Sequence, residues 1–238
     1  MGSHHAFLLL RFEGPLQSWG IRSRWDVRDS ADEPTKSAAI GMLGSALGYP
    51  MYDPRLEKLD EELMMAVRVE HPGTPMVDFH TISGRMQTAS GAWRGSTEAP
   101  STIISPRTYL QDAAFLVALQ GEIALMSRCA EALQAPFWPV FLGRKACIPT
   151  RPVFDALSEV YVSLRDVMEQ RPWRWDAQQH VARPLPEKLK CIIEDPGGSS
   201  TRYDRIRVNP ARMYAWRRVD VDLVDFPGVD DGQTGGVM

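Results

Sequence analysis

The residues of this chain whose types and spacing could bind a ligand are clustered cations. In the stretch FLGRKACIP, Gly143 is followed at once by Arg144 and Lys145, and a proline ends the stretch. Two further clusters contain Arg11, Arg22, Arg24 and Arg28 with Trp19 and Trp25, and Arg202, Arg205, Arg207, Arg212, Arg217 and Arg218. Arginine and lysine neutralise phosphates, and exposed aromatic rings stack on unpaired bases. The pattern favours contact with a single-stranded nucleic acid; the alternative is a solvated charged surface with the tryptophans in the core.

Composition and motifs argue against several other functions. The chain has 27 Lys plus Arg against 30 Asp plus Glu in 238 residues, so its net charge of −3 indicates no general attraction to nucleic acid. It contains no Walker loop and no GxGxxG, HExxH or GxSxG sequence. Cys129, Cys147 and Cys191 are odd in number and far apart, which favours reduced thiols in a cytoplasmic protein. We therefore predict no metal, no cofactor and no membrane span.

The elements that position the cations follow from hydrophobic periodicity. Residues 6–12 form a short apolar run closed by a turn, which is typical of a buried strand. After a polar loop we expect two helices, at 35–49 and 54–64, and then a strand at 64–73. An arm poor in large apolar residues at 80–109, a second strand at 109–121 and an amphipathic helix at 122–136 follow. The arm is either disordered or a projecting hairpin. This order is compatible with an α+β fold built on a split β-α-β sheet of the ferredoxin type.

The same features suggest how the chain is divided. Residues 1–5 look like the remnant of an expression tag. We expect a ferredoxin-like domain at 6–150, with the arm at 80–109 as a projecting thumb, and a smaller C-terminal β-rich lobe at 151–220. Residues 221–238 are acidic and expected to fray.

Five short motifs occur in an order that resembles a known family. They are LRFEGPLQSWG, PTKSAAIGMLGSALG, FHTISG, RTYLQDAAFLVAL and PVFLGRKACIPTRPVF. Together they resemble the CasD family of RAMP proteins, subunits of the type I-E CRISPR surveillance complex Cascade, over about residues 6–155. The resemblance implies a ferredoxin-like domain with a glycine-rich loop, a thumb and a small C-terminal domain. It implies a non-catalytic role: holding the 5′ handle of the guide RNA and capping the backbone.

The resemblance also implies partners and site residues. The partners would be the guide RNA, backbone subunits of the CasC type and a large subunit of the CasA type, with target DNA met only through the complex. The implied RNA-facing positions are Gln17, Ser18, Trp19, Gly20, Lys36, Ser37, Arg107, Tyr109, Gly143, Arg144 and Lys145. Lys36 and Ser37 would open a helix, where free N–H groups favour an anion. Core packing is the alternative for Trp19, and a structural salt bridge is the alternative for Arg107.

An enzymatic alternative also follows from the resemblance. In type I-C systems the related subunit cuts precursor RNA without a metal, and His80, Tyr109 and Lys145 would be the corresponding set here. His80 lies close to Asp78 in the sequence, an arrangement that is also common for a structural hydrogen bond. The motifs are of the type I-E kind, in which a separate endonuclease cuts, and they favour the binding role. A small-molecule enzyme on an α/β scaffold is a third possibility, without any cofactor motif to support it.

Overall fold

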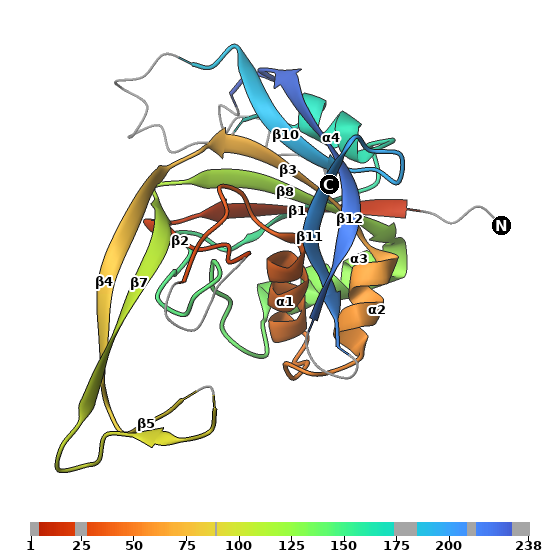
Figure 1. Cartoon of the computed structure of the whole chain (residues 1–238). Coiled ribbons are helices and arrows are strands. Elements are labelled where there is room, and N and C mark those ends of the chain that lie inside the picture. The colour runs from red at the N-terminus through yellow and green to blue at the C-terminus, as the bar shows by residue number, and fades with distance from the viewer. Residues whose placement is uncertain (1–4, 22–27, 89, 174–184, 209–212, 230–238) are drawn as a thin grey trace.

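A computed structural model describes residues 5–21, 28–88, 90–173, 185–208 and 213–229 (Figure 1). The expected cationic residues Arg22, Arg24 and Arg212 lie outside the described residues, as does Trp25. Most of the expected tag remnant, and the tail from residue 230 onward, also fall outside them.

One seven-stranded sheet forms the centre of the molecule. Its strands are β1 His5–Glu13, β3 Met64–His71, β8 Ala114–Glu122, β9 Phe154–Ser158, β10 Lys188–Glu194, β11 Ser200–Arg207 and β12 Met213–Asp225. They lie in the order β11-β12-β10-β3-β8-β1-β9, and every neighbouring pair is antiparallel. β1 and β8 are almost entirely buried, because both faces of the sheet are covered at its centre.

Within the described ranges, four helices cover the two faces of this sheet. They are α1 Lys36–Ala46, α2 Arg55–Glu62, α3 Ile123–Gln134 and α4 Leu164–Gln170. Leu8 and Leu10 of β1 belong to the core shared with α1, α2 and α3, whereas Phe7 and Leu9 belong to the core shared with α4. The alternation follows from the two-residue period of a strand. In the described residues no helix is long and apolar enough to span a membrane.

The expected α+β class is confirmed, because the fold mixes helices with a mostly antiparallel sheet. The C-terminal strands β10, β11 and β12 do not form a sheet of their own. Cys191, Ile192 and Ile193 of β10 pair with residues 66–68 of β3, so the C-terminal third extends the central sheet. Apolar residues of β10 are also buried in both cores. The β-rich lobe expected at 151–220 therefore shares its sheet with the preceding strands.

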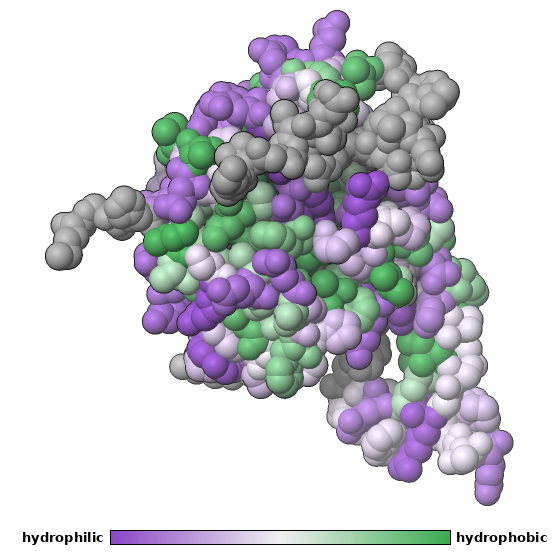
Figure 2. Space-filling model, turned by 180° about the vertical axis from the view of Figure 1, so that it is seen from behind, coloured by the Kyte–Doolittle hydropathy of each residue, from purple (hydrophilic) through white to green (hydrophobic). Residues whose placement is uncertain are grey.

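A long two-stranded arm projects from the body (Figure 1). Its strands are β4 Thr74–Gly84 and β7 Ser101–Gln111, with β5 Met86–Gln87 and β6 Trp93–Arg94 near its tip and β2 Leu16–Gln17 at its base. β4 and β7 pair in continuous register from Thr74–Gln111 to Gly84–Ser101. Viewed from behind, the arm stands clear of the body and shows mostly hydrophilic residues with a small hydrophobic area (Figure 2). The arm therefore begins at Thr74, six residues before the start at residue 80 that the change in composition predicted.

Candidate nucleic-acid interface

A cavity of about 730 Å³ lies between the base of the arm, helix α1 and the C-terminal hairpin β11–β12. Its lining comprises Ser18, Gly20, Ile21, Arg28, Thr35, Ser37, Ala38, Gly41, Met42, Ser45, Pro139, Val140, Phe141, Gly143, Arg144 and Tyr214. Five of the sequence-predicted residues therefore meet in one place, although they come from three separate segments. The volume is in the range of sites that hold a small molecule or a nucleotide.

Gly143 fits the wall of this cavity because it lacks a side chain. Its φ is +95°, and a Cβ atom there would overlap the carbonyl oxygen of Ser18. The Ser18 N–H donates to the Leu142 carbonyl oxygen at 3.0 Å, which holds the two segments together. The sequence suggested that Gly143 lets backbone approach a phosphate. In the structure its close approach is to the chain's own loop.

The Arg144 side chain ties three segments together at the cavity edge. Its guanidinium donates to the carbonyl oxygens of Thr108 at 3.0 Å, Arg28 at 2.9 Å and Asp29 at 3.2 Å. The same group lies 4.6 Å from the centre of the Tyr109 ring, which is buried. None of these partners is a carboxylate, so they fix the guanidinium without cancelling its charge. Arg144 thus combines a structural role with a positive potential at the cavity.

Lys145 and Arg107 carry nearby charges that no carboxylate in the described part of the chain neutralises. Lys145 is exposed, and no ion pair or hydrogen bond of its ammonium group is found within the described ranges. Arg107 is half-buried in β7, and its Nε has no hydrogen-bond partner. No described carboxylate lies within ion-pair distance of Arg107, so the salt bridge considered for it is not observed. Cations held in this way are suited to meeting phosphates.

Two predicted contact residues instead belong to the core. Trp19 is fully buried and stacks on Phe12, with ring centroids 5.4 Å apart. Gln17 is also fully buried, and its Nε2 donates to the carbonyl oxygens of Phe12 at 3.2 Å and Ala113 at 2.6 Å. Their types and positions suited either role. Core packing is what is observed for Trp19. Its loop is held in place by a hydrogen bond from the Trp19 N–H to the Ser30 hydroxyl oxygen.

The expected anion site at the start of α1 is already occupied by a carboxylate of the protein. The Lys36 N–H donates to Asp204 at 2.9 Å, and the Thr35 hydroxyl accepts from the Ala38 N–H. The Lys36 side chain is buried against Glu194, with Nζ to Oε1 at 2.9 Å. Burial lowers the pKa of Lys36, and the Glu194 charge opposes this shift. The prediction that Lys36 faces RNA is therefore wrong for this structure.

Helix α1 instead presents small side chains to the cavity. Ser37, Gly41 and Ser45 recur every four residues along one face and all line the cavity. A Cβ atom at Gly41 would meet nothing within 4 Å. Gly41 thus faces open space, whereas Gly44 of the same helix accommodates Leu56 of α2. The four-residue spacing of these small residues is visible in the sequence. The sequence alone does not show whether this face of the helix lines a cavity or packs against the sheet.

The C-terminal arginine cluster is mostly neutralised. The pairs are Arg202–Glu33 at 3.6 Å, Arg205–Asp60 at 2.7 Å, Arg207–Glu57 at 3.4 Å and Arg217–Asp204 at 2.7 Å. Arg218 donates to the carbonyl oxygen of Gly198 at 3.2 Å. The cluster therefore joins the hairpin to the body more than it forms an open basic patch. The observed ion pairs differ both from the expected nucleic-acid contacts and from the solvated charged surface that was the alternative.

Two residues of the enzymatic alternative, His80 and Tyr109, lie apart along the arm. His80 lies opposite Ser105 in the arm, whereas Tyr109 is four residues further along β7, roughly 13 Å away at the rise of a strand. His80 Nδ1 lies 3.6 Å from Asp78, and both side chains are partly exposed. Among the described residues no three His, Cys, Asp or Glu side chains gather as metal ligands.

Two solved structures are similar to this fold over most of its length. One, described as a CRISPR RNA-guided surveillance complex, gives a TM-score of 0.73 at 33% identity, covering 93% of this chain and 91% of that one. Another, described as the crystal structure of a Cas protein, gives a TM-score of 0.66 at 32% identity, covering 94% and 97%. The fold is therefore similar to that of CRISPR-associated proteins over nearly all of its length.

Sequence comparisons agree with the structural ones. The CRISPR system Cascade subunit CasD of Escherichia coli (strain K12) is 32% identical over 161 residues, which is 63% of this chain and 70% of the relative. A family model described as CRISPR-associated protein (Cas_Cas5) matches residues 7–220, from the first strand to β12. The expected resemblance is thus confirmed, and the chain belongs to the Cas5 family of CRISPR-associated proteins.

Proposed function

We propose that this chain is a Cascade subunit that holds the 5′ handle of a guide RNA in the cavity, caps one end of the backbone and does not itself cut RNA. One observation carries the proposal: the cavity has an open floor of small residues beside Arg144 and Lys145, whose charges no described carboxylate cancels. Phosphates would lie toward the two cations, and a sugar or base would lie over α1.

The polar groups of the cavity suit such a ligand. The Ser18 and Ser37 hydroxyls line the cavity while making long contacts of 3.3 and 3.2 Å within the protein. Hydroxyls both donate and accept, so they can serve ribose and phosphate oxygens without a fixed charge. Met42 and Tyr214 add apolar surface on which a base could rest.

The arm would meet the neighbouring backbone subunit of the CasC type. Phe79 is 67% exposed, and Val77 and Ile104 are also exposed, all three at alternate positions on one face of the ribbon. Exposed apolar side chains on a projecting ribbon are typical of an interaction surface. We further infer that β3, β8, β1 and β9 with α1 to α3 form a ferredoxin-like unit, as their spatial order supports. The cytoplasmic assignment rests on three buried free cysteines.

The test is retention of guide RNA by the assembled complex across a salt series. Lys145→Ala should weaken retention and reduce the salt dependence of log K by about 0.7, the value for one phosphate contact on a single strand. Lys58→Ala is the matched control, because Lys58 is exposed on α2 and does not line the cavity. Identical retention by wild type and Lys145→Ala at every salt concentration would remove Lys145 from the RNA site.

The non-catalytic part of the proposal has its own assay. The purified subunit is incubated with its precursor repeat RNA in EDTA, and the RNA is expected to stay intact. Site-specific cleavage that disappears in His80→Ala would establish the metal-independent endoribonuclease instead.

A further inference from the structure

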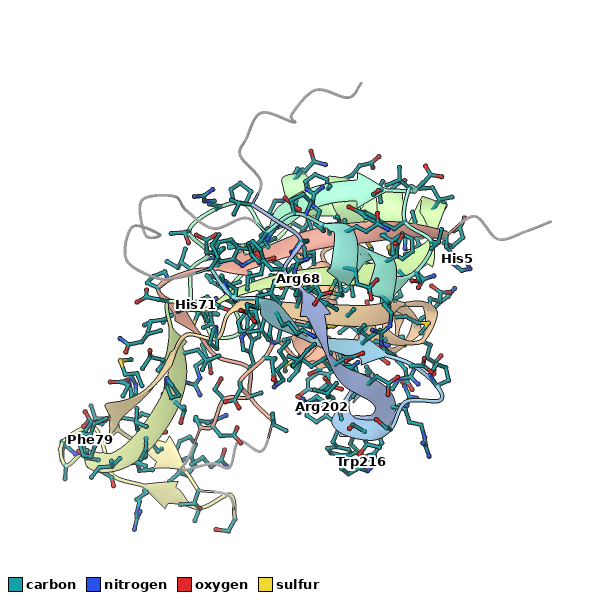
Figure 3. The ribbon with its side chains drawn as sticks, turned by 90° about the horizontal axis from the view of Figure 1, so that it is seen from above. His5, Arg68, His71, Phe79, Arg202 and Trp216 are labelled. Carbon is teal, nitrogen blue, oxygen red and sulfur yellow. The ribbon has the colours of Figure 1, made fainter. Side chains whose placement is uncertain are left out.

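An aromatic cluster lies exposed on the C-terminal hairpin. Trp216 is 65% exposed and Tyr203 is 41% exposed. Their ring centroids are 4.9 Å apart, and the Tyr214 ring lies 6.3 Å from that of Tyr203. Figure 3 shows Trp216 at the outer side of the hairpin, away from the body, with Arg202 close by. Large rings exposed together on a rigid element are unusual enough to indicate a binding surface.

The hairpin holds these rings in a fixed position. Tyr203 and Trp216 are directly opposite partners in the β11–β12 ladder. Arg217 of β12 pairs with Asp204 of β11 inside the hairpin, and Arg205 of β11 pairs with Asp60 of α2 in the body, at 2.7 Å each. The ring cluster is therefore preorganised, which reduces the entropy lost when a flat ligand stacks on it.

The cluster is continuous with the cavity. Tyr214 contacts Tyr203 and also lines the cavity. Tyr203 borders a second, smaller hollow together with Ile21, and Ile21 in turn lines the main cavity. A nucleic-acid strand that leaves the cavity beside Tyr214 would therefore reach the rings of Tyr203 and Trp216 directly.

We propose that Tyr203, Tyr214 and Trp216 form a stacking platform for one or two unpaired bases of a single-stranded RNA whose neighbouring nucleotides occupy the cavity. This inference rests on the proposed function. Exposed aromatic rings beside arginines are the surface that binds single strands without base-specific hydrogen bonds. Arg218 is exposed, and its guanidinium donates to the carbonyl oxygen of Gly198, so its charge remains available to the strand. The continuity of the rings with the cavity, together with the charge of Arg218, favours RNA over a protein partner.

The experiment measures binding of the subunit to a short single-stranded RNA of its own repeat sequence, with 2-aminopurine at each position in turn. Wild type should quench the fluorescence at one or two adjacent positions through stacking. Trp216→Ala should abolish that quenching and weaken affinity at least about fivefold, the lower range for one stacked base. Trp216→Phe should restore most of the affinity, and the salt dependence should stay as in wild type because no charge is lost.

The control is Tyr52→Ala, which removes a ring that is 60% exposed and does not line the cavity. Unchanged RNA affinity and quenching in Trp216→Ala, with loss of binding in Lys145→Ala, would overturn the platform and leave the proposed function standing. If Trp216→Ala instead weakened only assembly with other protein subunits, the hairpin would be a protein-docking surface. Absence of RNA binding by wild type would overturn both proposals.

Discussion

The carbonyl oxygen of Ser18 occupies the space that a Cβ atom at Gly143 would need. These two residues join the loop after β2 to the loop that carries Arg144, and both line the cavity. The contact is backbone to backbone, so neither segment can move aside by changing a side-chain rotamer. The cavity wall therefore depends on a glycine at position 143.

Gly143→Ala should destabilise the protein by more than about 2 kcal/mol, because it adds a left-handed backbone penalty to a steric overlap. The φ of +95° and the overlap with Ser18 are independent reasons for the same outcome. Urea denaturation of the purified subunit measures the change. A Gly143→Ala protein as stable as wild type would mean that the two loops do not meet in this way.

Substitutions at Gly41 should separate stability from binding. Gly41→Ala should raise the free energy of unfolding by up to about 1 kcal/mol, because the helix gains propensity and the new methyl meets no atom. Gly41→Leu should leave the protein folded but fill the cavity floor, so RNA affinity should fall. Thermal melting and RNA titration of both variants give the comparison. Equal affinity of Gly41→Leu and wild type would place the RNA elsewhere.

The central strands β1, β3 and β8 could be predicted from the sequence because their apolar runs are local, whereas residues 221–225, expected to fray, belong to β12 and pair with β10. The pattern at residues 6–12 required a buried strand, and β1 is one. The site could be predicted only in part. Tyr214 and Gly41 reach the same cavity from distant segments, and no local pattern records that meeting. The pairing of Arg205 with Asp60 is likewise a tertiary contact, so the C-terminal cluster looked more open than it is.

The adjacent cations Arg144 and Lys145 should behave differently when removed. Arg144→Ala loses donors to three carbonyl oxygens and should cost about 2 kcal/mol or more of stability. Lys145→Ala should change stability by less than about 0.5 kcal/mol, because its side chain is exposed. Urea midpoints test both values. Equal midpoints for the two variants would mean that the Arg144 contacts contribute nothing, and loss of RNA binding in Arg144→Ala could then be assigned to charge alone.

Asp204→Ala should be among the most damaging single changes. It leaves the Arg217 guanidinium buried without its closest carboxylate and removes the acceptor of the Lys36 N–H. Removing one partner of a buried ion pair costs about 3–5 kcal/mol, and the cost here should be at the lower end because Glu194 remains 3.6 Å from Arg217. Asp204→Asn keeps an acceptor for the N–H and should cost less. If both variants had wild-type midpoints in urea, the start of α1 would be free to bind another anion.

The buried thiols should make stability fall at high pH. Burial raises the pKa of Cys129 to about 11 and that of Cys191 to about 12, from an ordinary value of 9.0. In the unfolded chain these thiols ionise near 9, whereas in the folded chain they stay protonated. Their contribution to the free energy of unfolding is therefore complete below pH 9 and is lost as the pH rises toward 11 and 12.

Urea midpoints measured between pH 8 and pH 10.5 test this contribution, with Cys191→Ala as the comparison. The variant should be less stable than wild type at pH 8, because a buried group is removed, but its midpoint should decline less steeply above pH 9. Native protein at pH 8 should also resist alkylation at Cys129, Cys147 and Cys191 until urea unfolds it, because all three thiols are buried. Rapid labelling without urea, or parallel pH profiles for the two proteins, would contradict the protected state of these thiols.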